Sequence, residues 1–311
     1  MLEEIGSAAV IGFGAIGAPL SDALQSMLGE GFHLIADGDR ADAIENERIT
    51  VNGRAFVPSV LRPSSHGPAR PLDLVIVCVK NYSLEPALND IERFVSPATM
   101  ILPLQNGVYA YERCKERFPD AAVLRGYIQG PNTRRRGNAI RYSNPGVIHF
   151  GSSSEGPSAV IVERLFRSAG IEAVREDDIE RMVWKKWMLN VAGNTVTALT
   201  SADYSDFRMS EDLVYVCRAS MNEFLEVAAA GGVVLGPGDV EDTLTYFRTY
   251  VGSKRTSMLE DVIACRRTEN EYLAGELVRR AHAHGIEVPV TETLYRLMRV
   301  KETLYRNGRS E

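Results

Sequence analysis

The spacing of apolar side chains divides this chain into two halves with different periods. In the first half, short apolar runs alternate with segments in which apolar residues recur every three or four positions. The run Asp73–Val79 is almost continuously apolar, which is typical of a strand buried on both faces. Such strands separated by helices predict a parallel sheet covered on both sides. The other predicted strands are Ala8–Ile11, Phe32–Ala36, Met100–Leu104 and Val123–Tyr127, with Arg54–Val57 a weaker candidate, and the first predicted helix is Ala15–Leu28.

The end of this half has a different pattern. Ala139–Tyr142 and Val147–Phe150 flank the sequence Ser143-Asn-Pro-Gly146, which is a strong turn signal. This arrangement predicts an antiparallel hairpin. Beyond it, Pro157–Ala169 is predicted to be a helix and Glu172–Arg175 a short strand.

Strand patterns end near residue 178, and the rest of the sequence has a helical period. Glycine and proline residues separate five predicted helices. These are Ile179–Leu199, Ser210–Ala230, Pro237–Tyr250, Thr268–His284 and Val290–Tyr305. The 311 residues also exceed what one hydrophobic core usually serves. We therefore predict an α/β fold with a Rossmann-type doubly wound parallel sheet over residues 1–177 and an all-α domain over residues 178–311.

Composition and charge change this picture little. With 45% hydrophobic and 24% charged residues, the chain is typical of a soluble globular protein. The net charge of −6 disfavours nucleic-acid and membrane-surface binding. The basic run Arg134–Arg136 is the exception, and we interpret it as a solvated hairpin or loop rather than a phosphate site. No apolar run could span a bilayer, and the four cysteines lack metal-site spacing, so we expect a cytoplasmic protein without a metal.

The turn after the first predicted strand carries a dinucleotide-binding pattern. In the strand–turn–helix context, its first glycine permits a tight turn, its second lets a pyrophosphate approach the backbone, and its third lets the helix pack closely. The following helix offers unpaired N–H groups to the phosphates. All six residues of the turn are therefore predicted to bind a nicotinamide dinucleotide: Gly12-Phe13-Gly14-Ala15-Ile16-Gly17.

The end of the second predicted strand gives conflicting signals about the cofactor. Asp37 lies where a carboxylate would accept hydrogen bonds from the adenosine ribose and repel a 2′-phosphate, which favours NAD. Arg40 lies three residues later and could instead bind the 2′-phosphate of NADP. Asp37 could also be only a solvated turn residue.

Two further polar residues end predicted strands. Lys80 follows the strand Asp73–Val79, and Asn106 follows Met100–Leu104. Ligands of doubly wound sheets lie outside the carboxyl ends of the strands, so both residues are placed to touch cofactor or substrate. Asn106-Gly107 could alternatively be only a turn.

The first predicted helix of the second half carries a polar stripe on an otherwise apolar surface. Lys186, Asn190 and Asn194 are spaced by four residues and therefore share one helix face. Buried ammonium and amide groups need partners, and a pocket holding a polar substrate would supply them. Desolvation lowers the pKa of an ammonium toward neutrality, which suits Lys186 as a general acid. The alternative is a surface lysine, and we expect neighbouring Lys185 to point away from the stripe.

Two other residues are weaker candidates from the sequence alone. Thr268-Glu-Asn-Glu271 has the pattern of a capping box, which would place Glu269 in the first turn of a helix as an ionised carboxylate. There it could engage the substrate or the catalytic ammonium, or simply stabilise the helix. Ser257 could bind a substrate carboxylate, with Lys254 or Arg255 assisting, or be an ordinary serine at a helix start.

Together these motifs resemble those of the ketopantoate reductase (2-dehydropantoate 2-reductase) family over nearly the whole chain. The glycine-rich turn comes first in the order of the resemblance. It is followed by Val79-Lys80, Gln105-Asn106-Gly107-Val108, Trp184-Lys-Lys186 with Asn190 and Asn194, Ser257-Met-Leu-Glu-Asp261, Arg267-Thr-Glu269 with Tyr272-Leu, and Arg280-Ala-His-Ala-His-Gly-Ile-Glu-Val-Pro289.

The resemblance implies reduction of ketopantoate to D-pantoate by NADPH, a step toward pantothenate and coenzyme A. It implies that Lys186 is the general acid and that Glu269 supports it and contacts substrate and cofactor. It further implies that Asn190 and Asn194 bind the substrate hydroxyl and that Ser257 binds its carboxylate. Asn106 and Lys80 would lie by the nicotinamide and the substrate.

Two departures from the family pattern leave alternatives open. Many family members have an arginine where this chain has Asp37, so NADH is a second candidate cofactor, although Arg40 partly restores the NADP signal. The segment Gln129–Arg136 differs from the small residues expected there, so another small 2-oxo or 3-hydroxy acid is a second candidate substrate. A non-catalytic dinucleotide sensor is a third interpretation, which the presence of Lys186 disfavours. A homodimer is an arrangement that the C-terminal helices would allow.

Overall fold

The structure is a computed structural model that describes residues 4–47, 49–66, 69–152, 156–250 and 254–308. It divides into two compact units. Residues 1–105 and 110–179 form the N-terminal unit, and residues 106–109 and 180–311 form the helical unit. The segment 106–109 therefore packs with the helical unit, although it lies far from that unit in the sequence.

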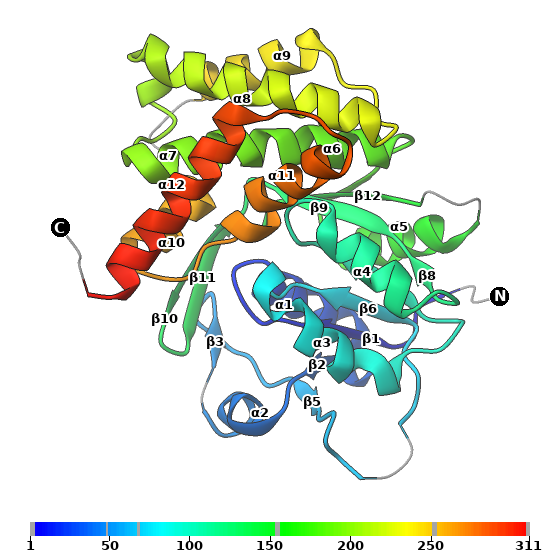
Figure 1. Ribbon diagram of the computed structural model, residues 1–311. Coiled ribbons are helices and arrows are strands. Elements are labelled where there is room, and N and C mark those ends of the chain that lie inside the picture. Colours follow the sequence, from blue (N-terminus) through cyan, green and yellow to red (C-terminus); the bar gives the residue numbers. More distant parts are fainter. Residues whose placement is uncertain (1–3, 48, 67–68, 153–155, 251–253, 309–311) are drawn as a thin grey trace. The chain divides into compact units, whose positions relative to one another are not determined.

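A six-stranded parallel sheet forms the centre of the N-terminal unit (Figure 1). Its strand order is β5-β2-β1-β6-β7-β8, and each neighbouring pair is parallel. The direction of winding reverses between β1 and β6, which is where doubly wound sheets bind dinucleotides. The strands are β1 (Ala8–Ile11), β2 (Phe32–Ile35), β5 (Ser59–Leu61), β6 (Leu74–Val77), β7 (Met100–Pro103) and β8 (Ala122–Val123).

The predicted doubly wound sheet is confirmed, with differences at individual elements. The first helix begins at Gly17 rather than Ala15, because residues 13–16 form the glycine-rich turn. The predicted strand Val123–Tyr127 is divided between β8 and β9 (Arg125–Gln129), which belong to different sheets. The helices of this unit are α1 (Gly17–Leu28), α2 (Gly38–Asn46), α3 (Leu84–Ile91), α4 (Tyr109–Arg117) and α5 (Ser158–Ser168), with the 3₁₀ turns η1 (Gly29–Gly31), η2 (Asn81–Ser83) and η3 (Glu92–Phe94).

Two smaller sheets complete the N-terminal unit. One has the order β10-β11-β3-β4 and the other β13-β12-β9. The weaker strand candidate at Arg54–Val57 is the short strand β4 of the first of these sheets. The strands are β3 (Thr50–Val51), β4 (Arg54–Ala55), β10 (Asn132–Arg136), β11 (Ala139–Asn144), β12 (Val147–Gly151) and β13 (Ala173–Arg175).

The predicted hairpin between Ala139–Tyr142 and Val147–Phe150 is wrong. β11 pairs with β10, so the antiparallel hairpin turns at Gly137, one connection earlier, whereas β12 pairs with β9 and β13. The turn signal at Gly146 is real but transfers the chain between two sheets. Gly146 has a φ of 89° and lies so close to β9 that a Cβ there would be 2.9 Å from the carbonyl oxygen of Gln129.

The helical unit contains no strand among its described residues, which agrees with the predicted all-α half. Its long helices α8 and α12 pack on each other, and α12 also contacts α7 and α11 (Figure 1). The helices are α6 (Ile179–Leu189), α7 (Thr195–Thr200), α8 (Glu211–Ala230), α9 (Pro237–Thr249), α10 (Ser257–Ile263), α11 (Ala274–Ala283) and α12 (Pro289–Arg306). Shorter turns are the π-helical η4 (Asn190–Asn194) and the 3₁₀ turns η5 (Asp206–Arg208) and η6 (Asn270–Tyr272).

The predicted helix Thr268–His284 and its capping box are wrong at the N-terminal end. The α-helix begins only at Ala274, after η6. The Thr268 hydroxyl donates to the carboxylate of Glu302, at 2.6 Å, a residue of α12 that is distant in sequence. Glu269 therefore precedes a 3₁₀ turn and does not occupy the first turn of an α-helix.

Each unit has its own apolar core. Branched aliphatic residues of the strands dominate the N-terminal core, as expected for a sheet buried on both faces. In the helical unit, Trp184 and Trp187 meet Phe224 of α8 with ring centroids 6.0 and 5.0 Å from that of the phenylalanine. In the described part of the chain, no helix combines the length and apolar character needed to cross a membrane.

The glycine-rich turn yields a stability prediction. A Cβ on Gly12, whose φ is 100°, would lie 2.5 Å from the backbone nitrogen of Val79, whereas a Cβ on Gly14 would meet nothing within 4 Å. We expect Gly12→Ala to destabilise the protein by about 2 kcal/mol or more because it adds backbone strain to a clash. Gly14→Ala is the matched control and should unfold near the parent midpoint. Circular dichroism melts without cofactor measure both, and equal midpoints for the two variants would contradict the steric argument.

Candidate active site

The glycine-rich turn has the shape that a dinucleotide pyrophosphate requires. A Cβ at Gly17 would lie 2.1 Å from the carbonyl oxygen of Gly12, so the third glycine allows α1 to pack on the turn. The space around Gly14 is open. No side chain caps the N-terminus of α1, whose preceding residue is Ile16. The uncapped N-terminus of α1 and the open position beside Gly14 fit a phosphate group.

Asp37 makes hydrogen bonds within the protein. Its Oδ1 accepts from the backbone nitrogen of Gly38 at 2.9 Å and from the hydroxyl of Ser64 at 2.7 Å. Its Oδ2 accepts from the backbone nitrogen of Ser64 at 2.7 Å. The Ser64 and Gly38 hydrogen bonds lower the pKa of the Asp37 carboxyl, so it is ionised. Both oxygens of the carboxylate thus stabilise the start of α2 and the loop after β5.

Lys80 and Arg40 also belong to the N-terminal unit. Lys80 is half-buried and follows β6 at the start of η2, on the strand next to β1. Arg40 lies in the first turn of α2, immediately after Asp37 and the Gly38–Asp39 pair. Both therefore follow the carboxyl ends of strands that flank the glycine-rich turn, the edge where ligands of this fold bind.

In the helical unit, the polar stripe lies across a π-helical turn. α6 continues into η4 at Asn190 and returns to an α-helix at Thr195. π-turns insert one extra residue and often occur at functional sites. The wider turn still lets Asn194 Nδ2 donate to Asn190 Oδ1 at 3.2 Å. Asn190 Nδ2 is buried without a hydrogen-bond partner among the described residues, and such a group points to a ligand.

Lys186 has the electrostatic environment of a proton donor. Its pKa is lowered to about 7, mainly by burial; the carboxylate of Glu269 opposes this shift, and the charge of nearby Lys254 adds to it. Lys185 is different, because it forms ion pairs with Asp239 at 3.1 Å and with Asp242 at 2.8 Å on α9. The two adjacent lysines thus point to different surroundings, as their spacing on a helix predicts.

Glu269 is buried and lies close enough to Lys186 for their charges to interact. Its neighbours fix the segment: Thr268 is bound to Glu302, and Asn270 Nδ2 donates to the carbonyl oxygen of Tyr295 at 3.0 Å. Thr268 and Asn270, the residues on either side of Glu269, are therefore both anchored by hydrogen bonds. This gives Glu269 a defined position that does not depend on a helix dipole.

The segment after β7 reaches the same part of the helical unit. A Cβ at Gly107, which has a φ of 85°, would lie 3.4 Å from the carbonyl oxygen of Tyr272 and 3.6 Å from Trp187. The rings of Tyr109 and Tyr272 lie 5.1 Å apart. Asn106 thus precedes a turn that packs on α6 and η6, the elements that carry Lys186 and follow Glu269.

Ser257 is the first residue of α10 and is exposed. α10 packs against η4 and α7, and the hydroxyls of Thr256 and Thr197 are 2.8 Å apart across this contact. The Ser257 hydroxyl has no partner among the described residues, so it is available to a ligand. Lys254, two residues before Thr256, is close enough to lower the pKa of Lys186.

The structure thus brings the candidates together within two separate units. The helical unit holds Lys186, Asn190, Asn194, Glu269, Ser257 and Asn106, whereas the N-terminal unit holds the glycine-rich turn, Asp37, Arg40 and Lys80. Sequence reasoning missed Ser64, the partner of Asp37, and gave Lys254 only an assisting role. It also missed the π-turn, which has no sequence signature comparable to a glycine motif. Strand alternation in Asn132–Arg136 could have shown only that Arg135 lies on the opposite face from Arg134 and Arg136.

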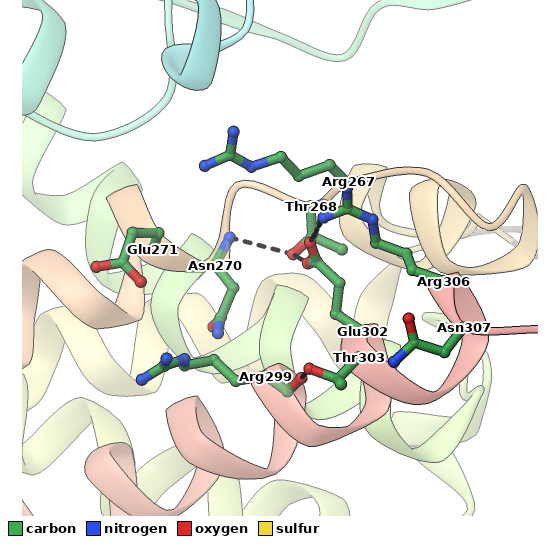
Figure 2. A pocket seen from close by; sticks show the side chains of 9 residues that line it. All are labelled: Arg267, Thr268, Asn270, Glu271, Arg299, Glu302, Thr303, Arg306 and Asn307. Atoms are coloured by element: carbon green, nitrogen blue, oxygen red, sulfur yellow. Dashed lines mark hydrogen bonds and ion pairs between the residues drawn. The ribbon is translucent and has the colours of Figure 1, made fainter.

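A separate cavity of about 430 Å³ lies beside the Glu269 segment (Figure 2). It is polar, and the side chain of Glu302 occupies part of its wall, bound to Thr268 and to Arg306 at 3.5 Å. The lining residues are Arg267, Thr268, Asn270, Glu271, Arg299, Glu302, Thr303, Arg306 and Asn307. Glu269 and Lys186 do not line it, so this cavity is distinct from the candidate site.

Comparison with known proteins identifies the family. The family model described as ketopantoate reductase PanE/ApbA matches residues 8–155, and the model of the C-terminal domain of that family matches residues 178–302. The 2-dehydropantoate 2-reductase of Halobacterium salinarum is 32% identical over 257 residues, which are 82% of each chain. That of Pyrococcus horikoshii is 25% identical and covers 95% of this chain and 97% of its own.

Solved structures have the same fold. A PanE/ApbA family ketopantoate reductase from Ralstonia eutropha JMP134 has a TM-score of 0.80 at 27% identity and covers 96% of this chain and 98% of its own. D-mandelate dehydrogenase, solved with NADH and anilino(oxo)acetate, has a TM-score of 0.84 at 21% identity with the same coverage. The matched family models and the identity to the Halobacterium relative show that this chain belongs to the ketopantoate reductase family of oxidoreductases.

Proposed function

We propose that this protein reduces 2-dehydropantoate to D-pantoate with NADPH, a step of pantothenate and coenzyme A biosynthesis. One observation carries the proposal: Lys186, with a pKa of about 7, begins a stripe that continues to the unpartnered buried amide of Asn190. A proton donor and an amide donor on one helix match a ketone and a hydroxyl on one small substrate. Membership of the ketopantoate reductase family supports this substrate.

Lys186 has the role of the general acid in this proposal. A bound nicotinamide would supply the hydride to the carbonyl carbon of the substrate. The Lys186 ammonium donates its proton from Nζ to the carbonyl oxygen, which becomes the new hydroxyl, and the lysine is left neutral. Near neutral pH, a pKa of about 7 keeps both protonation states accessible, so the lysine can donate and then regain its proton.

Other residues of the helical unit orient the substrate. Asn190 Nδ2 has a free N–H for the substrate hydroxyl, while its Oδ1 is held by Asn194. The Ser257 hydroxyl would donate to the substrate carboxylate, and Lys254 would add positive charge nearby. Glu269 stabilises the ammonium form of Lys186 and would accept from a substrate hydroxyl. Asn106, on the turn that packs on Trp187, would contact the substrate or the nicotinamide.

The residues of the N-terminal unit fit a dinucleotide. The open backbone at Gly14 and the uncapped N-terminus of α1 would hold the pyrophosphate, and Lys80 would lie beside the nicotinamide. Both carboxylate oxygens of Asp37 already accept hydrogen bonds from Ser64 and Gly38. This argues against selection of NADH through a hydrogen bond from Asp37 to the ribose. Arg40 favours NADPH.

A second candidate is reduction of another small 2-oxo acid on the same site. The D-mandelate dehydrogenase structure, solved with NADH, shows that this fold is also found in an enzyme named for an aryl 2-hydroxy acid. The direct test is an assay of the purified protein that follows nicotinamide absorbance. Ketopantoate, 2-oxoisovalerate and benzoylformate are each supplied with NADPH and with NADH. We expect ketopantoate with NADPH to give the highest kcat/KM, and no turnover of ketopantoate with either cofactor would refute the proposal.

A homodimer is part of the proposal. The neighbouring ketopantoate reductase from Staphylococcus aureus is described as dimeric. On α12 of this chain, Leu297, Val300 and Leu304 are exposed apolar residues at helical spacing, 50%, 56% and 41% accessible. Such a stripe suits contact with a second copy. Sedimentation equilibrium measures the mass directly, and a monomer at micromolar concentration would contradict this part.

Removing the proposed acid should affect chemistry more than cofactor binding. We expect Lys186→Ala to lower kcat by about 10²- to 10⁴-fold, the usual contribution of a positioned acid. NADPH affinity, measured by quenching of protein fluorescence, should stay within about threefold. Lys185→Ala is the matched control, because that lysine is paired with α9, and it should keep near-parental kcat. A Lys186→Ala enzyme that retains parental kcat would assign the acid to another group.

The lowered pKa of Lys186 also predicts how stability depends on pH. Between about pH 7 and the usual lysine pKa near 10.4, the unfolded chain binds one proton more than the folded protein. Raising the pH through this window therefore stabilises the folded parent relative to Lys186→Met, by up to about 1.4 kcal/mol per pH unit. Below pH 7 the difference should become constant.

Urea unfolding at several pH values between 7 and 9.5 measures this difference. Both tryptophans of the chain, Trp184 and Trp187, lie in α6, so their fluorescence reports on the helical unit. Lys185→Met is the control, because ion pairs raise the pKa of Lys185 and it stays charged in this range. Parallel pH profiles for the parent and Lys186→Met would show that Lys186 is charged and solvated instead.

The unpartnered amide of Asn190 predicts a substrate-dependent defect. We expect Asn190→Ala to lower kcat/KM for ketopantoate about tenfold or more, because a hydrogen bond to the substrate hydroxyl is lost. For 2-oxoisovalerate, which lacks the hydroxymethyl group, the same change should cost less than threefold. An equal loss with both substrates would mean that Asn190 supports the π-turn rather than recognising the hydroxyl.

A further inference from the structure

Strand β10, which carries the basic run Arg134–Arg136 and forms a hairpin with β11, lies against the glycine-rich turn. The Thr133 hydroxyl of β10 donates to the carbonyl oxygen of Ala15 at 2.8 Å. Two residues further, Arg135 Nη1 donates to the carbonyl oxygen of Phe13 at 3.4 Å, and Arg135 Nε donates to that of Gly137 at 2.9 Å. The guanidinium is thus held at the turn where a dinucleotide phosphate would lie.

The strand register explains why only one arginine of the basic run faces this turn. Side chains alternate along a strand, so Thr133 and Arg135 share one face, and Arg134 and Arg136 lie on the other. Across the hairpin, Arg135 is opposite Ile140, which is 2% accessible and belongs to the core of the N-terminal unit. Arg134 and Arg136 are exposed and provide internal controls on the same strand.

Arg135 lies near a second arginine. The pKa of Arg40 on α2 is lowered mainly by burial and also by the charge of Arg135, which is close enough to interact with it. Among the residues that the structure describes, neither arginine has a carboxylate partner. Other arginines nearby do have one: Arg54 pairs with Asp22 at 2.8 Å, and Arg62 pairs with Asp42 at 2.7 Å. Two adjacent cations without a counter-charge repel each other, and an anion between them would remove that cost.

The loop beside this pair is firmly held. Ser64 binds both oxygens of Asp37, and Arg93 donates to the carbonyl oxygen of Pro63 at 2.7 Å. The negative charge of Asp37 is therefore directed to the loop after β5 and to the backbone of Gly38. These hydrogen bonds stabilise the ionised carboxylate and hold both of its oxygens on Ser64 and the Gly38 backbone.

We propose that Arg135, reaching from β10, forms with Arg40 the site that binds the 2′-phosphate of the cofactor's adenosine. The glycine-rich turn lies at the end of β1 and α2 follows β2, so the pair spans the two elements that border the adenosine side of a dinucleotide. The site makes the cofactor preference depend on the hairpin, which the sequence alone marked as a solvated segment. This inference rests on the cofactor part of the proposed function and not on the substrate.

Equilibrium binding without substrate tests the assignment. The probes are NADPH and NADH, followed by fluorescence, and adenosine 2′,5′-bisphosphate and adenosine 5′-monophosphate, followed by calorimetry. The second pair differs only in the 2′-phosphate. We expect Arg135→Ala to weaken binding of NADPH and of the bisphosphate about tenfold to a hundredfold, the usual range for a hydrogen bond between two charged groups. Binding of NADH and of the monophosphate should change less than threefold. Arg134→Ala and Arg136→Ala should change none of the four.

The alternative outcomes are distinct. Equal weakening of NADPH and NADH by Arg135→Ala would place the guanidinium on the pyrophosphate and overturn the assignment, as would no change with any probe. A lower melting temperature of the cofactor-free variant with equal losses would show that Arg135 only supports the turn. Since no turnover is measured, failure of ketopantoate as a substrate would leave the result for Arg135 intact.

Discussion

The helical unit is organised around the cost of keeping one ammonium away from water. Lys186 lies on a helix that contributes Val183, Trp184, Trp187 and Met188 to the core, and burial lowers its pKa to about 7. The carboxylate of Glu269 opposes that fall, and Glu269 is itself fixed by Thr268 and Asn270. Helix α12, through Glu302 and Tyr295, supplies those anchors. A catalytic function for Lys186 would thus depend on residues far from it in sequence.

In the N-terminal unit, backbone geometry and positive charge together border the glycine-rich turn. Close contacts at Gly12 and Gly17 leave the space at Gly14 open, and the hairpin β10–β11 brings Arg135 to the same turn. The features that border this turn are therefore both local, in the glycine spacing, and non-local, in the register of the hairpin. Only the local part is visible in a motif.

The same distinction decides which features the sequence could predict. The parallel sheet and the glycine-rich turn depend on short-range patterns, so both are largely predictable, although the edge strand β5 is not predicted and the predicted strand Val123–Tyr127 is divided between two sheets. The hairpin at Ser143–Gly146 is misassigned because a turn signal does not say which strand receives the chain, and β9 competes with β11 for β12. The capping box fails because the residues after Glu269 form the 3₁₀ turn η6, so the α-helix begins only at Ala274. The roles of Lys186, Asn190 and Glu269 stay predictions until variants are measured.

The π-turn at Asn190–Asn194 has a consequence for how this protein can evolve. Seven residues of a regular α-helix return to within about 20° of the starting direction, whereas eight residues overshoot it by about 80°. The extra residue of the π-turn absorbs this difference, so Lys186 and Asn194, which are eight positions apart, can share one face. Deleting one residue of the turn would therefore give a regular helix in which the Lys186 and Asn194 positions still lie on one face. Selection that retains the extra residue would then act on the widened backbone of the turn itself and not on the alignment of the stripe.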